Sequence, residues 1–280
     1  MSGVLYIVAT PIGNLDDISL RATKILQQVD VIAAEDTRHS IRLLNHLGIR
    51  NRMMSLHEHN ESARIEGIIN DLMSGSNIAL ISDAGTPLIS DPGYPLVKAV
   101  LDAGLRVSPI PGACSIIAAL SAAGMPTMPF TFYGFLPQKN TEKISKLELL
   151  KQQHGTLVFL ESTHRIERLM EQMCDIFVDN RVVLAKELTK TFEHFLSGAP
   201  SEILSLLQQQ PSLAKGEFVV LIDNPVTANE QVLNAEDMEI LKLLLADLPL
   251  KKAVRLLARI TGKKKNDIYQ LALALSQPLS

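Results

Sequence analysis

The sequence predicts an α/β fold in which two α/β domains are followed by a small helical tail. Through residue 125, short aliphatic or β-branched runs alternate with longer amphipathic stretches. Strands that alternate with helices indicate a mainly parallel sheet covered on both faces. The alternation starts again at Pro129, and from Ala235 the pattern is helical throughout. We therefore expect domains at residues 1–125, 126–224 and 235–280, with a polar linker at 224–234.

The expected elements of the first domain share one arrangement, in which each strand leads through a loop to a helix. The strands are 5–9, 31–34, 77–82 and 106–110, and the helices are 18–28, 37–47, 62–73, 94–103 and 115–123. Ligands bind outside the carboxyl ends of strands in such sheets. The loops that follow these strands are therefore where we look for a site.

The second domain is expected to have the same mixed character. Its strands are 130–135, 156–160, 181–187 and 217–222, and its helices are 163–177 and 201–209. The two domains share no sequence repeat that we could identify.

Composition narrows the class of protein. A chain of 280 residues with 46% hydrophobic content can bury a large core, and its net charge of -3 excludes a globally basic nucleic-acid coat. The N-terminus lacks the cationic and apolar regions of a signal peptide, and the apolar stretch 113–125 is too short to span a bilayer. Cys114 and Cys174 have no CxxC spacing. We expect a soluble cytoplasmic protein with no membrane segment and no metal.

The spacing of the glycines argues against two common phosphate-binding loops. No two of the 15 glycines lie closer than eight residues, so the GxGxxG and GxxxxGK[ST] patterns are missing. Instead, Gly-bearing turns follow three of the expected strands, at 9–14, 82–93 and 109–115. These turns could be ordinary strand-to-helix connections, or they could bring bare backbone close to one ligand.

Five motifs, taken in order, resemble one family. They are TPIGNL at 10–15, AEDTR at 34–38, SDAGTP with SDPG at 82–93, PGA at 111–113 and GFLP at 134–137. This order resembles the small-subunit ribosomal RNA methyltransferase I family, the 16S rRNA cytidine 2′-O-methyltransferases with the tetrapyrrole-methylase-like fold. The resemblance covers nearly the whole chain. It implies S-adenosylmethionine as methyl donor, a donor cleft between the two α/β domains, a homodimer, and a decoding-centre cytidine of 16S rRNA in the 30S subunit as substrate.

The resemblance also implies which residues bind the donor. The first domain contributes Pro11, Asp83, Ala84, Gly85, Thr86, Ile89, Ser115 and Ile116, and the second contributes Leu160, Ala199 and Glu217. Relatives of the fold usually carry Gly-Asp-Pro where this chain has Gly85-Thr86-Pro87. Either Asp83 or Thr86 could take the place of that aspartate. Small residues, carbonyls and aliphatic walls suit a sulfonium cofactor with a flat adenine.

Three carboxylates are candidates for a general base. A ribose 2′-hydroxyl is a poor nucleophile until its proton leaves, so a nearby carboxylate could assist the transfer. Glu35, Asp36 and Glu161 each follow an expected strand on the ligand side. The alternative is that each is a turn or helix N-terminal carboxylate, stabilised by the helix dipole.

Two sets of cations are candidates for RNA contact. Arg38, Lys139 and Arg165 lie near expected strand ends and could hold phosphates or pair with neighbouring acids. The tail segment 251–265 has no acid and seven basic residues, namely Lys251, Lys252, Arg255, Arg259, Lys263, Lys264 and Lys265. Gly262 could end one helix, and Asn266 or Asp267 could cap the next at 268–275, as in a helix-turn-helix. RNA binding is favoured over a solvated tail.

Two other functions remain open. One is a tetrapyrrole methyltransferase that acts on a small acidic macrocycle, against which the basic tail and the SDAGTP variant both count. The other is a non-catalytic RNA-binding assembly factor, which would have no need of a methyl donor.

Overall fold

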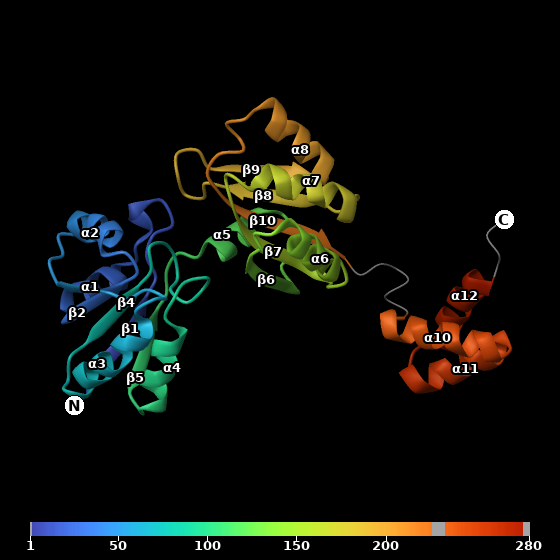
Figure 1. Cartoon of the computed structure of the whole chain (residues 1–280), viewed down its shortest axis with the longest axis horizontal. Coiled ribbons are helices and arrows are strands. Elements are labelled where there is room, and N and C mark those ends of the chain that lie inside the picture. The colour runs from blue at the N-terminus through green and yellow to red at the C-terminus, as the bar shows by residue number, and fades with distance from the viewer. Residues whose placement is uncertain (1, 226–232, 277–280) are drawn as a thin grey trace. The chain divides into compact units, whose positions relative to one another are not determined.

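The structure is a computed structural model that describes residues 2–225 and 233–276. The chain divides into two compact units, Met1–Asn224 and Pro225–Ser280. The first unit contains two five-stranded sheets (Figure 1), so the predicted fold class is confirmed. The boundary expected between residues 125 and 126 lies within this unit and stays a prediction. Among the described residues, none of the helices combines the length and apolarity needed to cross a membrane.

The first sheet is parallel throughout, as predicted. Its strand order is β3-β2-β4-β1-β5. The strands are β1 (Val4–Val8), β2 (Val31–Ala34), β3 (Arg52–Ser55), β4 (Ile78–Ile81) and β5 (Arg106–Ile110). The helices that cover it are α1 (Leu20–Gln28), α2 (Thr37–His46), α3 (Glu61–Met73) and α4 (Tyr94–Asp102), and a short 3-10 helix (Leu15–Asp17) precedes α1.

Both faces of this sheet are buried under helices. Helices α1 and α2 pack on one face, where Leu26 and Leu44 meet Ile32. Helices α3 and α4 pack on the other, where Leu72 and Val100 join one cluster with Leu80. All four residues of β2 and of β4 are buried. This double burial explains why the two strands appear in the sequence as continuous apolar runs.

The second sheet is mixed, with the order β6-β7-β10-β8-β9. Its strands are β6 (Phe130–Phe135), β7 (Gly155–Ser162), β8 (Val182–Lys186), β9 (His194–Gly198) and β10 (Glu217–Asn224). The β6–β7 pair is parallel, and the other described pairs are antiparallel. The helices α6 (Asn140–Lys151), α7 (Ile166–Ile176) and α8 (Pro200–Gln209) supply the core on one face.

The other face of the second sheet is covered by a helix that follows the last strand of the first. Helix α5 (Ser115–Ala122) packs there, and its Ile116 and Leu120 form one cluster with Val183 and Val219. Figure 1 shows α5 beside β10, between the two sheets. The loops at the carboxyl ends of β1, β4 and β5 therefore lie close to the second sheet.

Four of the described elements lie outside the sequence prediction, namely the 3-10 helix (Leu15–Asp17), β3, α6 and β9. Several boundaries also differ. Strand β7 continues to Ser162, so Glu161 lies within the strand instead of following it, and α7 begins at Ile166 instead of 163. Most of the expected linker, residues 226–232, lies outside the described residues.

The described part of the tail unit is a bundle of three helices, α10 (Ala235–Asp247), α11 (Leu250–Thr261) and α12 (Lys265–Ser276). Leu241, Val254, Leu257 and Ile268 are fully buried in its core. Gly262 ends α11 in the left-handed conformation, with φ at 72°, as predicted. The expected cap of α12 is wrong, because the helix starts at Lys265 and the Lys264 carbonyl accepts the backbone N–H of residue 267. Asn266 and Asp267 consequently lie in the first turn.

Candidate functional site

Three loops at the carboxyl edge of the first sheet are tied together. The backbone N–H of Thr10 donates to the Gly85 carbonyl at 2.8 Å, and the Gly85 N–H donates back at 3.0 Å. The Thr86 hydroxyl donates to the Ala113 carbonyl at 3.0 Å. The loops after β1, β4 and β5 therefore form one surface, as expected for neighbouring parallel strands.

The loop after β4 has an unusual backbone. Leu88 and Ser90 both adopt the left-handed region, with φ near 73° and 70°, which residues other than glycine seldom occupy. Gly85 has φ of 83°, and a Cβ there would lie 3.2 Å from the Ile12 side chain. Such local strain persists only where surrounding contacts determine the conformation, so this loop presents a fixed surface.

An apolar cavity of about 240 Å³ lies where this surface meets the second sheet. Ile12, Ala84 and Ser115 line it from the segments that follow strands of the first sheet, and Leu160 and Leu188 are among those that line it from the second sheet and its loops. Most of its walls are aliphatic or aromatic. The cavity has the character of a site for a flat, largely apolar group.

A second, more polar cavity of about 530 Å³ adjoins the first. Both are lined by Ile12, Ala84 and Glu217, so the two cavities meet at these residues. The polar cavity is also lined by Pro11, Asp83, Ser40, Arg42 and Lys190.

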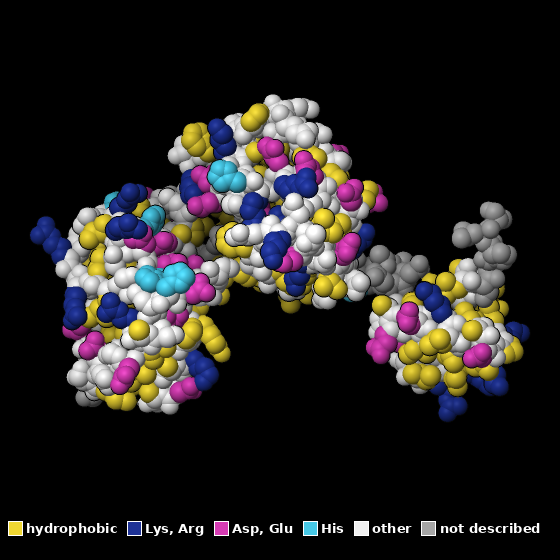
Figure 2. Space-filling view, in the orientation of Figure 1, with side chains coloured by type: hydrophobic (Ala, Val, Ile, Leu, Met, Phe, Trp, Pro, Cys, Tyr) yellow, Lys and Arg dark blue, Asp and Glu magenta, His cyan; other side chains and the backbone are white. Residues whose placement is uncertain are grey.

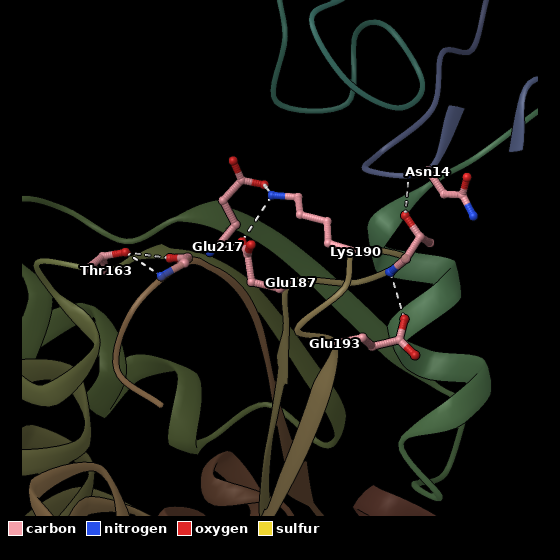
Figure 3. A network of polar contacts seen from close by, with 8 residues as sticks. Asn14, Thr163, Glu187, Lys190, Glu193 and Glu217 are labelled. Atoms are coloured by element: carbon pink, nitrogen blue, oxygen red, sulfur yellow. Dashed lines mark hydrogen bonds and ion pairs between the residues drawn. The ribbon is translucent and has the colours of Figure 1, made fainter. Parts of the chain in front are cut away.

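Lys190 and Glu217, which line the polar cavity, belong to a network of polar contacts (Figure 3). The Lys190 ammonium donates to Glu187 at 3.0 Å and to Glu217 at 3.1 Å. The Thr189 hydroxyl accepts the Asn14 backbone N–H at 3.0 Å, and this bond joins the loop after β1 to the loop after β8. We call residues 187–193 the clasp loop.

Two residues of the clasp loop, Glu187 and Thr189, have positive φ. The pKa shifts of Lys190 and Glu187 indicate that the ion pair between them is stable. Burial acts to lower the pKa of Lys190, but its hydrogen bonds to the two carboxylates outweigh burial and raise it. Burial acts to raise the pKa of Glu187, yet the Glu217 backbone N–H and the Lys190 ammonium lower it overall. The charged forms of both side chains therefore predominate at neutral pH.

The structure brings most of the predicted donor-binding residues to the two cavities. Ala84, Ser115, Leu160 and Glu217 line the apolar cavity, while Pro11 and Asp83 line the polar one. Gly85 and Thr86 hold the loops together next to them. Both side chains make a hydrogen bond, since the Asp83 Oδ1 accepts the Asp36 backbone N–H at 3.1 Å and the Thr86 hydroxyl donates to Ala113. Asp83 also lines a cavity, so it is the better candidate for the position of the missing aspartate.

Three other predicted donor residues do not line either cavity. Ile116 is buried in the core between α5 and the second sheet, and Ile89 is 43% exposed. Ala199 follows Gly198, which pairs with Val182 at the far end of β8 from the cavities. The antiparallel course of β9, which the sequence did not reveal, carries Ala199 away from the cleft.

The three candidate bases lie in different surroundings. The Asp36 carboxylate caps α2 and pairs with Arg38 at 2.9 Å, and these hydrogen bonds lower its pKa to about 2. The pKa of Glu35 is raised by burial and then by Asp91 and Asp83. Neither of these two residues lines the apolar or the polar cavity. Asp36 is therefore a weak base whose carboxylate already binds the α2 N-terminus and Arg38.

Glu161 lines the apolar cavity, and its side chain is fully buried. Its Oε1 accepts the Ser162 backbone N–H at 2.9 Å and lies 3.1 Å from the Arg165 Nε. Its Oε2 has no hydrogen-bond partner among the described residues. A buried acceptor without a partner is costly, so this oxygen is suited to receive a donor from a ligand.

The cations expected to contact RNA differ in how strongly they are already bonded within the protein. Arg165 donates to the backbone carbonyls of Leu136 and Pro137 and pairs with Glu161, which matches the alternative of pairing with a neighbouring acid. Lys139 and Arg38 are exposed but pair with Glu142 and Asp36.

In the tail unit, six of the seven basic residues are exposed, namely Lys251, Lys252, Arg255, Arg259, Lys264 and Lys265. Figure 2 shows dark-blue side chains around the edge of this unit. Lys263 instead pairs with Asp237 at 2.7 Å and joins α10 to the turn after α11.

Comparison with known proteins places the chain in a family. The model of the tetrapyrrole (corrin/porphyrin) methylases matches residues 4–204, and a model described as the RsmI C-terminal HTH domain matches residues 231–276. The chain is 50% identical to ribosomal RNA small subunit methyltransferase I of Escherichia coli O157:H7, over 97% of this chain and 95% of that protein. This chain belongs to the ribosomal RNA small subunit methyltransferase I family. The resemblance seen in the five motifs is therefore confirmed.

A second member of the ribosomal RNA small subunit methyltransferase I family, from Pseudomonas aeruginosa, is 48% identical and covers 97% of each chain. Among solved structures, the methyltransferase CobJ aligns with a TM-score of 0.60 at 19% identity, over 81% of this chain and 96% of that one. A cobalt precorrin-4 methyltransferase aligns with a TM-score of 0.58 at 18% identity, over 79% of this chain and 94% of that one. These structural likenesses show the fold alone.

Proposed function

We propose that this protein transfers a methyl group from S-adenosylmethionine to the 2′ oxygen of a decoding-centre cytidine in the 16S rRNA of the small ribosomal subunit. The supporting observation is a pair of joined cavities between the two domains, in a chain whose relatives at 48% and 50% identity are named ribosomal RNA small subunit methyltransferase I. One cavity suits the donor, and the other leaves room for an acceptor.

The donor fits the apolar cavity by its chemistry. A flat adenine suits aliphatic walls such as Leu160 and Leu188, and the orphan Oε2 of Glu161 could accept a hydrogen bond from an amine or a hydroxyl of the donor. S-Adenosylmethionine supplies an electrophilic methyl group on a sulfonium. Small residues such as Ala84, where the cavities meet, leave space for that group to reach an acceptor.

The chemistry is an in-line displacement. A bond forms between the ribose 2′ oxygen and the methyl carbon while the bond between sulfur and that carbon breaks. Sulfur keeps the electron pair, so a neutral thioether leaves, and the 2′-hydroxyl proton passes to a base or to water. Much of the rate enhancement can come from holding the oxygen about 3 to 3.5 Å from the methyl carbon. The clasp loop and the strained loop after β4 provide that rigidity.

The identity of the base is a separate part of the proposal. We propose that Glu35, Asp36 and Glu161 include it, and of these three Glu161 is the one that lines a cavity. Alanine substitution of each residue in turn, followed by single-turnover methyl transfer, tests the idea. Three unchanged rates would eliminate all three.

RNA and a second subunit complete the proposal. The exposed cations of the tail unit are suited to RNA phosphates. We propose that the enzyme acts as a homodimer in the cytoplasm, where ribosomal subunits are found. Calorimetry with S-adenosylmethionine tests the first step, because a non-catalytic assembly factor would show no binding. Analytical ultracentrifugation tests the dimer.

A further inference from the structure

The polar cavity is lined by both cations and carboxylates, and its carboxylates are Asp83 and Glu217. Arg42 and His39 extend from α2 to line it, and Lys190 lines it from the clasp loop. Within the described part of the chain, Arg42 makes no hydrogen bond or ion pair. Lys190 has three ammonium hydrogens and gives two hydrogen bonds, to Glu187 and Glu217. Arg42 is therefore the cation free to bind an anion, and Lys190 keeps one N–H for the same ligand while its charge is balanced by two carboxylates.

A buried hydroxyl in the same cavity also lacks a partner. Ser40 is 3% exposed and lines the cavity, and its Oγ has no hydrogen-bond partner among the described residues. A buried hydroxyl is ordinarily satisfied, because leaving it unpaired costs about 1–3 kcal/mol. Ser40 lies two residues before Arg42 on α2, so one helix presents both groups. This observation is independent of the charges and also indicates a polar ligand.

The size of the polar cavity and its junction with the apolar one fit a nucleotide as that ligand. The polar cavity, at about 530 Å³, is more than twice the apolar one and can hold a nucleotide. The adenine and ribose of the methyl donor suit the walls of the apolar cavity, while the phosphate of a nucleotide suits Arg42 and Lys190 in the polar cavity. Ile12, Ala84 and Glu217 line both cavities. A methyl group presented at this junction would face a ribose in the polar cavity.

We infer that the polar cavity is the binding site of the target RNA nucleotide, whose phosphate lies on Arg42 and Lys190 and whose sugar or base hydrogen-bonds to Ser40. The inference rests on the proposed function, which it deepens by assigning each ligand to one cavity. Pro11 and Asp83, which were expected to bind the donor, would then lie beside the nucleotide. A nucleotide inside a cavity must leave its helical stack, as bases do in other enzymes that modify them. Arg38, Lys139 and the tail would then contact flanking RNA.

The test uses the full-length protein with three variants. Arg42→Gln and Ser40→Ala remove the two groups assigned to the nucleotide. Arg106→Gln is the matched control, because Arg106 is also exposed but begins β5, at the opposite edge of the sheet from the cavities. For each variant we would measure the KM for 30S subunits at several salt concentrations, the kcat, and the Kd for S-adenosylhomocysteine by calorimetry.

We expect Arg42→Gln to raise the KM for 30S subunits about ten-fold or more, because it removes a charge-assisted hydrogen bond. The slope of log KM against log salt should fall by about 0.7 to 1, the contribution of one phosphate contact. Arg42→Lys should restore the slope. Ser40→Ala should raise the KM several-fold, and the Kd for S-adenosylhomocysteine should stay within about two-fold in every variant.

Two results would overturn the inference alone. If the wild type is active and both variants match Arg106→Gln, the nucleotide lies elsewhere. If Arg42→Gln weakens S-adenosylhomocysteine instead of RNA, the polar cavity holds the amino-acid end of the donor. A wild-type protein that binds the donor analogue but methylates no RNA would refute the proposed function itself, and the inference with it.

Discussion

The contact between Gly13 and the clasp loop gives the sharpest prediction. A Cβ at Gly13 would lie 2.5 Å from the Lys190 Cγ, 2.8 Å from the Thr189 Oγ1 and 2.9 Å from the Leu188 carbonyl oxygen. The shortest of these is about 0.9 Å below the 3.4 Å at which ordinary van der Waals contact begins. One obstacle is backbone, and Lys190 is anchored by two carboxylates. The loops must therefore separate.

Gly13→Ala should lower the free energy of unfolding by about 1–3 kcal/mol, the usual cost of overpacking a tight contact. It should also break the bond between the Asn14 N–H and Thr189. Under the proposed function, a shift approaching 1 Å between the two walls of the cleft should slow single-turnover methyl transfer by up to about 100-fold. Urea denaturation measures the first effect and rapid quench the second.

A second glycine supplies the control for this experiment. Gly67 lies inside α3, and a Cβ added there would have no neighbouring atom within 4 Å. Gly67→Ala should stabilise the protein by about 0.5–1 kcal/mol, because alanine is the better helix former. If Gly13→Ala matched the wild type in both stability and rate, the clasp contact would have no part in shaping the cleft.

Three further predictions address the acids, the clasp and the tail. Burial and the neighbouring Asp91 and Asp83 raise the pKa of Glu35, so the ionised side chain destabilises the fold at pH values above that pKa. Glu35→Gln should therefore stabilise the protein at pH 7. Below about pH 4, where the carboxyl is protonated, the urea midpoints of the variant and the wild type should converge. Lys190→Met leaves the largely buried Glu187 without its cation. The free energy of unfolding, measured by urea denaturation, should fall by about 1–2 kcal/mol. An unchanged free energy of unfolding would mean that the ion pair does not stabilise the fold. Removing Pro225–Ser280, a separate compact unit, should weaken RNA binding and flatten its salt dependence while the donor Kd is unchanged; equal RNA affinity would contradict a role for the tail.

The central strands could be predicted because their burial leaves a clear pattern. The runs at β2 and β4 are apolar at every position, since helices cover both faces. Strands β3 and β9 have no such apolar run and were not predicted, although the edge strands β5 and β6 were. The sequence of β3 is RMMS, and that of β9 is HFLSG.

Helix α6 was missed for a different reason. Its buried stripe consists of Lys143, Leu147 and Leu150, so a lysine occupies a position where the helical pattern requires an apolar residue. Lys143 is 2% exposed, and burial lowers its pKa, followed by repulsion from Arg165. A buried cation in a core stripe is uncommon enough that periodicity cannot anticipate it.

The cleft was only partly predictable. Its loops follow strands in the sequence, so Pro11, Asp83 and Ser115 could be proposed through the family motifs. Lys190 and Glu217 meet although they are 27 residues apart, because β8 and β10 are adjacent antiparallel strands. Arg42 and Ser40 show no local motif, and only the fold brings α2 to the cavity.

The most direct test of the account is to locate the transferred methyl group. The full-length protein would be incubated with isotopically labelled S-adenosylmethionine and either 30S subunits or naked 16S rRNA, and the labelled nucleotide mapped by nuclease digestion and mass spectrometry. We predict label on the ribose 2′ oxygen of one cytidine in the decoding centre. Label on a base, or none on either RNA, would contradict the assignment.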